Sequence, residues 1–287
     1  MNEVLVTPEE QARLDALPYR LPSKLRDLLD IFKWACRKKN TSGVFIFDGR
    51  SGMGKTTLSF QTGLYCDPNF SLANVYFTPE AFLEGLRNAQ PGTIHVFDEA
   101  LLISSRSAMS QINKMTIQAM SMIRSKKIIV IFNVNSIFDL DRNLALSRAD
   151  LLLHVYGESL TDRGKFMAFF TGMDGWDRIK HLYLHGKKYY DYSKPKSNFN
   201  TTFSSYFVLD EEIYEKKKQE GINKFLSGDT KIGRADYKAR KSRDNLVIWI
   251  RNNTKLNIKE MSEIAEVTTA TIDKIISDWK YRQEDSG

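Results

Sequence analysis

Short apolar runs alternate with stretches of helical periodicity between residues 43 and 190. Each run has the length of a buried strand, and turn-forming residues separate it from the helical stretch that follows. This alternation predicts an α/β fold in which helices flank a central, mostly parallel sheet. Strands are expected at 43–48, 74–77, 93–97, 128–132 and 151–155, with a hairpin over 166–170 and 181–184.

The segments on either side have different patterns. Residues 191–242 are polar, rich in Lys, Ser and Asn, and predict a connector that wraps or extends. Residues 243–287 return to helical periodicity and predict a small all-α domain, with helices over about 244–251, 258–265 and 269–281. Residues 1–42 predict a helical lead-in, because apolar side chains recur there at helical spacing: Leu25, Leu28, Leu29, Phe32 and Ala35.

Basic charge is concentrated in one segment. The chain of 287 residues has 42 Lys and Arg against 35 Asp and Glu, a formal net charge of +7. The whole surplus lies in residues 216–243, which hold ten basic and three acidic side chains. One interpretation is the solvated surface of a linker. The other is a basic connector that contacts duplex DNA through Lys238, Arg240, Lys241 and Arg243.

Other features of the sequence exclude several classes of protein. Cys36 and Cys66 are the only cysteines, too few for a disulfide framework or a zinc cage. No apolar run is long enough to span a membrane, and the first ten residues lack the pattern of a secretory signal. We therefore expect a cytoplasmic protein of a bacterium, an archaeon or a virus in its host cell.

A phosphate-binding motif follows the first expected strand. Residues 49–56 read Gly-Arg-Ser-Gly-Met-Gly-Lys-Thr and fit the pattern G-x-x-x-x-G-K-[ST]. In this motif backbone N–H groups and the N-terminus of the next helix bind phosphate oxygens. We expect Lys55 to reach the β- and γ-phosphates of ATP and the Thr56 hydroxyl to bind Mg²⁺. The expected nucleotide contacts are Gly49, Arg50, Ser51, Gly52, Met53, Gly54, Lys55, Thr56 and Thr57.

Polar residues follow the next two core strands. Asp98 and Glu99 end the run at 93–97, where Asp98 would bind Mg²⁺ and Glu99 would activate the attacking water. Asn133 follows the run at 128–132 and would hold that water or sense the γ-phosphate, with Asn135 as the alternative. Acidic and Asn residues also end strands simply as turn formers. Their distance from the phosphate loop favours an ATP-hydrolysing site.

A single phosphate-binding lysine and Mg²⁺ neutralise only part of the negative charge that develops in the transition state. An arginine from a neighbouring subunit commonly neutralises the rest. Arg124 ends a helix expected over 109–124, and Arg148 precedes the expected strand at 151–155. The alternative for each is a surface or ion-pairing role. We rank Arg124 ahead of Arg148 as the arginine that acts in the next subunit.

The order of these motifs resembles the FtsK/HerA superfamily of DNA-pumping ATPases, including its Zot-like and viral packaging branches. The resemblance covers about residues 40–160 and includes the segment 139–150, Asp-Leu-Asp-Arg-Asn-Leu-Ala-Leu-Ser-Arg-Ala-Asp. It implies a ring, usually hexameric, that moves double-stranded DNA, with an arginine donated between subunits. Asn133 stands where this family commonly has Gln, whereas Asn and an arginine placed like Arg148 are more usual in AAA+ ATPases.

Residues 261–272 follow the helix-turn-helix pattern, with Glu266 at the turn position where Gly is usual. In this interpretation the second helix faces a major groove of DNA. The alternative is an interaction module that does not touch DNA. The residues expected to contact DNA are Thr268, Thr269, Thr271 and Lys274.

Four hypotheses follow for function. The first is an oligomeric, ATP-hydrolysing motor that translocates or packages duplex DNA. The second is an AAA+-like assembly switch on DNA, of the transposition or replication type, that acts with a partner protein. The third is a DNA-binding regulator that senses nucleotide. A nucleotide kinase is the fourth and is disfavoured by Glu99 and by the C-terminal helices.

Overall fold

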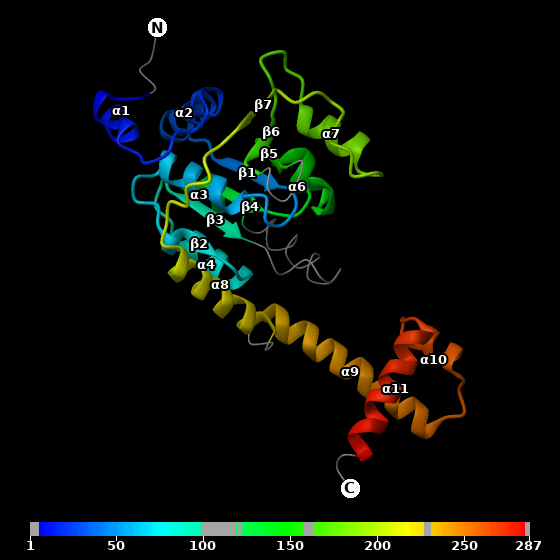
Figure 1. Cartoon of the computed structure of the whole chain (residues 1–287). Coiled ribbons are helices and arrows are strands. Elements are labelled where there is room, and N and C mark those ends of the chain that lie inside the picture. Colours follow the sequence, from blue (N-terminus) through cyan, green and yellow to red (C-terminus); the bar gives the residue numbers. More distant parts are fainter. Residues whose placement is uncertain (1–5, 99–118, 120–121, 158–162, 227–230, 285–287) are drawn as a thin grey trace. The chain divides into compact units, whose positions relative to one another are not determined.

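The computed structural model describes residues 6–98, 119, 122–157, 163–226 and 231–284 (Figure 1). The chain forms two compact units, Met1–Asn223 and Lys224–Gly287. This division differs from the boundaries expected at residues 42, 190 and 242, because the lead-in and much of the expected connector belong to the first unit. The two units are described separately below.

A seven-stranded sheet forms the centre of the first unit, in the order β2-β3-β4-β1-β5-β6-β7. The first five strands of the chain run parallel, and β6 and β7 add an antiparallel edge. The expectation of an α/β fold with a mostly parallel sheet is therefore confirmed. The strands are β1 (Gly43–Asp48), β2 (Val75–Tyr76), β3 (Ile94–Asp98), β4 (Ile129–Asn133), β5 (Leu151–Tyr156), β6 (Lys165–Phe169) and β7 (Phe199–Thr202).

The parallel register brings the carboxyl ends of three strands together. β4 lies between β1 and β3, and Asn133 pairs with Phe47 on one side and Asp98 on the other. β1, β3 and β4 are buried along their whole length, which explains why they read as continuous apolar runs. Polar side chains at their ends consequently meet at one edge of the sheet.

Helices cover both faces of the sheet (Figure 1). On one face, Leu25, Leu29 and Phe60 share a core with Phe45 and Phe47 of β1. On the other, Phe82 packs 5.2 Å from Phe97, between ring centroids. The helices of this unit are α1 (Pro8–Asp15), α2 (Ser23–Lys38), α3 (Lys55–Cys66), α4 (Pro79–Asn88), α6 (Arg142–Ser147), α7 (Arg178–Gly186) and α8 (Glu211–Leu226), with short 3-10 turns at Leu72–Asn74 and Ile137–Asp139.

The lead-in helix expected within residues 1–42 is confirmed as α2, in which Leu25 and Leu29 are fully buried. The helix expected over 109–124 lies mostly outside the described residues. Its described end is helical over 122–126, and Ala119 and Ile123 are buried.

The expected hairpin is wrong in its second strand. Residues 181–184 lie in α7, and β6 pairs antiparallel with β5 and β7 instead. Ile179, Leu182 and Tyr183 are buried at the 3–4 spacing of a helix, and Asp177 caps the first turn by accepting from the Lys180 N–H at 2.9 Å. The short run His-Leu-Tyr-Leu at 181–184 is compatible with a strand or with a helix. Burial along one helical face shows that it forms a helix.

Residues 199–223, expected as part of a connector, pack on the sheet domain. Aromatic side chains spaced through this polar segment anchor it: Phe199 lies 6.1 Å from Phe166, and Phe207 and Tyr214 lie 5.4 and 5.5 Å from Phe60, between ring centroids. This packing brings α8 to the edge of the sheet.

Over residues 231–284 the second unit has three helices: α9 (Lys231–Asn253), α10 (Ile258–Ile264) and α11 (Thr269–Glu284). The helix expected over 244–251 is the end of the longer α9, whereas α10 and α11 lie close to their expected positions. Glu266, between α10 and α11, adopts a left-handed conformation with φ of 52°. A small core holds the unit together and consists of Val247, Ile250, Met261, Ile272, Ile275 and Ile276.

Candidate nucleotide site

The loop after β1 has the backbone geometry of a phosphate cradle. Gly49 has φ of +131°, and a Cβ there would lie 1.9 Å from the carbonyl oxygen of Val155, so only glycine fits. Gly54 has φ of +99° and is the N-cap of α3, which begins at Lys55. Glycine offers no side chain to the first turn, so the N–H groups of 55–57 are left for an anion.

Asp48, the last residue of β1, holds the start of this loop in place. Its buried carboxylate accepts from the N–H of Ile137 at 2.8 Å and from the hydroxyl of Tyr192. Its other oxygen lies 2.9 Å from Nδ1 of His154 on the neighbouring strand. These contacts commit Asp48 to fixing the end of β1, whereas Asp98, at the end of β3, lines the pocket.

Lys55 points back over the loop. Its ammonium donates to the carbonyl oxygens of Gly49 and Arg50, at 2.5 and 3.0 Å. Burial lowers the pKa of Lys55, while the carboxylates of Asp98 and Asp48 oppose that change. A charged lysine in a partly desolvated loop gains strongly from phosphate oxygens, which can replace both carbonyl contacts.

Thr56 and Asp98 place two oxygen groups side by side in the pocket. The Thr56 hydroxyl donates to Oδ2 of Asp98 at 3.1 Å, and Asp98 is 4% exposed. Burial raises the pKa of Asp98, opposed by hydrogen bonds from Tyr214 and Thr56. Ligand oxygens about 2.1 Å from an octahedral Mg²⁺ lie about 3 Å apart at adjacent positions. The spacing and the hard oxygen donors of this pair therefore fit Mg²⁺.

Asn133 occupies the end of β4, next to Asp98. Its Nδ2 donates to the Ser59 hydroxyl at 3.0 Å. Its Oδ1 is buried and has no hydrogen-bond donor among the residues that the structure describes. A buried amide oxygen without a donor is costly unless a water or a ligand supplies one. The site therefore offers an acceptor for a water beside the carboxylate of Asp98.

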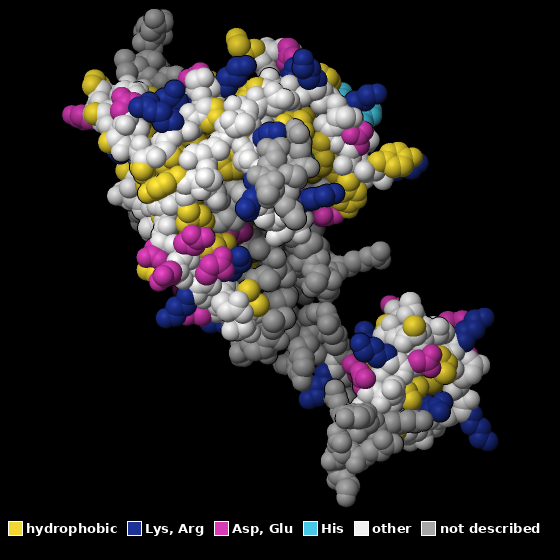
Figure 2. Space-filling model, viewed as in Figure 1, with side chains coloured by type: hydrophobic (Ala, Val, Ile, Leu, Met, Phe, Trp, Pro, Cys, Tyr) yellow, Lys and Arg dark blue, Asp and Glu magenta, His cyan; other side chains and the backbone are white. Residues whose placement is uncertain are grey.

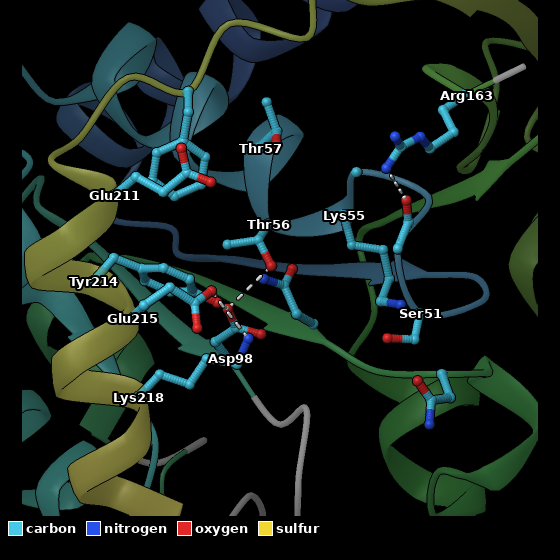
Figure 3. A pocket seen from close by; sticks show the side chains of 15 residues that line it. Ser51, Lys55, Thr56, Thr57, Asp98, Arg163, Glu211, Tyr214, Glu215 and Lys218 are labelled. Atoms are coloured by element: carbon cyan, nitrogen blue, oxygen red, sulfur yellow. Dashed lines mark hydrogen bonds and ion pairs between the residues drawn. The ribbon is translucent and has the colours of Figure 1, made fainter. Parts of the chain in front are cut away.

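The pocket has a volume of about 390 Å³ and brings most of these groups together (Figure 3). Lys55, Thr56, Asp98 and Asn133 all line it, as the sequence predicted. The other expected nucleotide contacts on its wall are Ser51, Gly52, Gly54 and Thr57.

Six of the expected site residues do not line the pocket or are not described, and one of them is Gly49, which shapes the loop through its backbone. Met53 is 7% exposed and packs into the core, and the exposed Arg50 does not line the pocket. Glu99 lies outside the described residues. Arg124 precedes β4 and Arg148 precedes β5, so both lie at the edge where the parallel strands begin, opposite the phosphate loop. Neither arginine therefore lies beside the phosphate loop of its own chain.

Sequence reasoning missed one whole wall of the pocket. Four side chains of α8 face into it from a single helical face (Figure 3). Their 3–4 spacing is a helical signal within a segment that reads as a polar connector. These residues are Glu211, Tyr214, Glu215 and Lys218.

Arg163 is a further missed residue. It lines the pocket opposite α8, and its Nη1 donates to the carbonyl oxygen of Gly52 at 3.3 Å (Figure 3). It lies two residues before β6 and falls in no motif, so only the antiparallel pairing of β5 with β6 brings it to the phosphate loop.

The residues expected to contact DNA lie in the second unit. Thr268, Thr269 and Lys274 are exposed, and Thr271 is half-buried with its N–H bonded to the Thr268 hydroxyl at 3.3 Å. Lys and Arg alternate with Asp and Glu on the visible face of this unit (Figure 2).

Two of the four connector residues expected to contact DNA have described side chains. Lys241 is exposed, and Arg243 pairs with Asp244 at 2.6 Å. The side chains of Lys238 and Arg240 lie outside the description.

No model of a known protein family matches the sequence, and no curated protein matches it. Among solved structures, the chain is similar to the N-terminal domain of zonular occludens toxin from Neisseria meningitidis. The two share 14% identity and a TM-score of 0.35, over 61% of this chain and 98% of that one. At this TM-score the likeness is weak, and the FtsK/HerA resemblance stays a prediction.

The fold and the site together are compatible with one class of protein. The α/β architecture, with a mostly parallel sheet flanked by helices, fits a P-loop nucleoside triphosphatase. Within the described part of the chain, no helix is both long and apolar enough to cross a membrane.

Proposed function

We propose that this protein is a Mg²⁺-dependent ATPase that works on duplex DNA. The observation that carries the ATPase assignment is the convergence of Lys55, Thr56 and Asp98 on one pocket beneath a glycine-rich loop. These groups come from the end of β3 and the start of α3 and match the lysine, hydroxyl and carboxylate that triphosphate hydrolysis uses.

Each group has a defined role in this proposal. The N–H groups at the start of α3 and the Lys55 ammonium bind the phosphate oxygens. Thr56 and Asp98 hold Mg²⁺, which neutralises charge on the β- and γ-phosphates when bound. The orphan Oδ1 of Asn133 accepts a hydrogen bond from the attacking water and orients it. Glu99, the next residue after Asp98, is the proposed base for that water.

Nucleotide binding and hydrolysis test this assignment directly. Lys55→Ala should abolish hydrolysis and weaken binding of a fluorescent ATP analogue, because the ammonium contributes to both. Lys188→Ala removes an exposed lysine away from the pocket and should match the wild type. Glu99→Gln should retain binding and lose hydrolysis. Equal binding and turnover by wild type and Lys55→Ala would contradict the assignment.

The DNA part of the proposal rests on the second unit and on the basic segment 216–243. Thr269 and Lys274 are exposed on α11, where they are available to a groove of DNA. The left-handed Glu266 supplies the tight turn that a helix-turn-helix requires between its helices. Lysines and arginines of the basic segment would bind phosphates without sequence preference.

The proposed motor acts as a ring, possibly a hexamer, in which Arg124 or Arg148 acts on the pocket of the next subunit. Both arginines are exposed and lie at the edge of the sheet away from their own phosphate loop, so neither serves its own pocket. An arginine that is remote from its own site and accessible to a neighbour suits this role. Loss of DNA-stimulated turnover in Arg124→Ala, with nucleotide binding retained, would support it.

Duplexes of increasing length distinguish the proposed motor from a switch. A translocating ring should show ATPase stimulation that grows with duplex length, because each encounter drives more steps on longer DNA. A switch should reach full stimulation on short duplexes or require a partner protein. A regulator should turn over ATP very slowly, and its DNA response to ATP should survive Glu99→Gln.

A further inference from the structure

Tyr214 makes a direct contact with the metal-side carboxylate. Its hydroxyl donates to Oδ2 of Asp98 at 2.9 Å, across 116 residues of sequence, and the side chain is buried (Figure 3). Its ring packs on Phe60, Phe77 and Phe207, with centroids 5.5 to 5.6 Å away. The hydroxyl is therefore held in place by the aromatic packing of α8 against the sheet domain.

The rest of α8 is docked by independent contacts. Lys217 donates to the carbonyl oxygens of Val75, at 2.8 Å, and Leu72. Gly221 lies so close to Phe77 that an added Cβ would be 2.6 Å from the Phe77 Cβ. α8 thus approaches the strand edge at several points, and Tyr214 is the point at which it reaches the candidate site.

The hydrogen bonds at Asp98 suggest how this contact behaves when metal binds. A carboxylate oxygen has two lone-pair directions, and Oδ2 accepts one bond from Thr56 and one from Tyr214. A cation between Thr56 and Asp98 requires the Thr56 hydroxyl to turn its hydrogen away from Oδ2 and to point a lone pair at the metal. Tyr214 approaches from α8 and can keep its bond, so it continues to orient the carboxylate.

We propose that Tyr214 is a positioning residue for the Mg²⁺-binding carboxylate of Asp98, and that it links metal occupancy to the docking of α8. This role rests on the proposed function. Because linkage is reciprocal, a metal that favours the Tyr214-bound carboxylate also favours docked α8. α8 is the helix through which the chain passes from the first unit to the second, since the boundary after Asn223 falls within it.

A Mg²⁺ titration of nucleotide binding tests the positioning role. Tyr214→Phe keeps the ring and removes only the hydroxyl. With a fluorescent ATP analogue, we expect its half-saturating Mg²⁺ concentration to rise about 10- to 100-fold, the range found for outer-shell partners of metal ligands. Affinity in EDTA should stay within about 2-fold of the wild type, because Lys55 and the loop are untouched. Tyr189→Phe removes a hydroxyl from an exposed tyrosine and should change neither value.

Hydrogen exchange of residues 211–223 tests the link to α8. Adding Mg²⁺ to protein saturated with a non-hydrolysable ATP analogue should slow exchange of these amides in the wild type. The same addition should leave Tyr214→Phe unchanged. Lys217→Met should exchange faster at the outset, because it loses a docking contact, yet retain the Mg²⁺-dependent slowing.

The possible outcomes separate this role from the proposed function. If the wild type shows no Mg²⁺-dependent nucleotide binding, the ATPase assignment fails and the role fails with it. If wild type and Tyr214→Phe show the same Mg²⁺ dependence, the ATPase assignment stands and the role of Tyr214 is overturned. Tighter Mg²⁺ binding by Tyr214→Phe would also overturn it, because the hydroxyl would then compete with the metal.

Discussion

The candidate nucleotide pocket has two walls that differ in how the chain encodes them. The loop wall, residues 49–57, is continuous in sequence and works mainly through its backbone, which curls at Gly49 and Gly54 and presents N–H groups. The α8 wall, residues 211–218, comes from a distant part of the chain and works through side chains. The loop wall is recognisable from an eight-residue motif, whereas no motif in the sequence identifies the α8 wall.

The difference has a physical origin. Backbone cradles restrict sequence tightly, because positive φ and close approach exclude side chains at fixed positions. A side-chain contact such as that of Tyr214 with Asp98 requires only a hydroxyl at one point of a docked helix. Many polar, amphipathic sequences satisfy that requirement, so no short pattern identifies them. The two walls can therefore be compared by substitutions that disturb the loop backbone and by substitutions that remove single side chains.

The largest expected effect is on the backbone of the loop wall. Gly49→Ala should lower the free energy of unfolding by about 3 kcal/mol or more and abolish nucleotide binding, since its Cβ would strike the Val155 carbonyl. Gly52→Ala is the matched control: its Cβ meets no atom of the described residues within 4 Å, so it should cost only about 1 kcal/mol through its positive φ. Denaturant titration measures both, and equal losses would contradict a steric role for Gly49.

Asp98 lies where the two walls meet. Asp98→Asn should reduce Mg²⁺-dependent hydrolysis at least about 100-fold, because losing a ligand costs more than losing its outer-shell partner. It should nevertheless raise Tm at pH 7.5 without Mg²⁺. Burial raises the pKa of this carboxyl above its ordinary value of 3.8, so the folded state binds the proton more tightly and the ionised form costs stability as pH rises. A lower Tm would show that the carboxylate stabilises the metal-free fold.

The buried residue His95 should make the free energy of unfolding depend on pH independently of the candidate site. Burial lowers its pKa from 6.5 to about 4, and its ring nitrogens lie 2.9 Å from the Tyr76 hydroxyl and 3.0 Å from the Thr93 hydroxyl. The unfolded chain therefore binds the proton first as pH falls. The free energy of unfolding should drop by about 2 kcal/mol between pH 7 and pH 5 from this residue.

Denaturant titrations of wild type and His95→Gln at both pH values isolate the contribution of His95. The variant should lose most of that pH dependence, whatever its absolute stability. An unchanged pH dependence would assign the effect to other groups.

The smallest expected effect lies outside both walls. Lys274→Ala on α11 should weaken duplex binding several-fold and reduce the slope of log affinity against log salt by about 0.9, the value for one lost phosphate contact. Glu263→Ala, on α10, removes an exposed charge of opposite sign and should leave the slope no smaller. Fluorescence anisotropy across a salt series measures both, and an unchanged slope in Lys274→Ala would remove Lys274 from the interface.

Much of the sheet could be predicted because buried parallel strands read as continuous apolar runs. The runs at 43–48, 93–97 and 128–132 became β1, β3 and β4 with ends shifted by at most one residue. The short run at 181–184 fits the period of a strand as well as that of a helix, so the sequence pattern alone does not identify it as part of a helix. Their burial with Ile179 on one face of α7 is a property of the packed fold.

The candidate site was predictable on its loop side for a related reason. Lys55, Thr56, Asp98 and Asn133 follow strands, and parallel strands carry their ends to a common edge. By the same reasoning, Arg124 and Arg148 precede parallel strands and so lie at the opposite edge. Arg163 precedes β6, which is antiparallel, and for that reason reaches the phosphate loop.

The sequence by itself determined the phosphate loop, the core strands and the carboxylate that follows the third of them, because steric limits and burial act on neighbouring residues and leave a local record. Only the tertiary structure decided that α8 closes the pocket and that the Tyr214 hydroxyl reaches Asp98. Contacts between distant segments depend on the docking of Phe207, Tyr214 and Gly221 against α3 and the strand edge. That docking reflects the summed packing of many side chains, which no single stretch of the chain records.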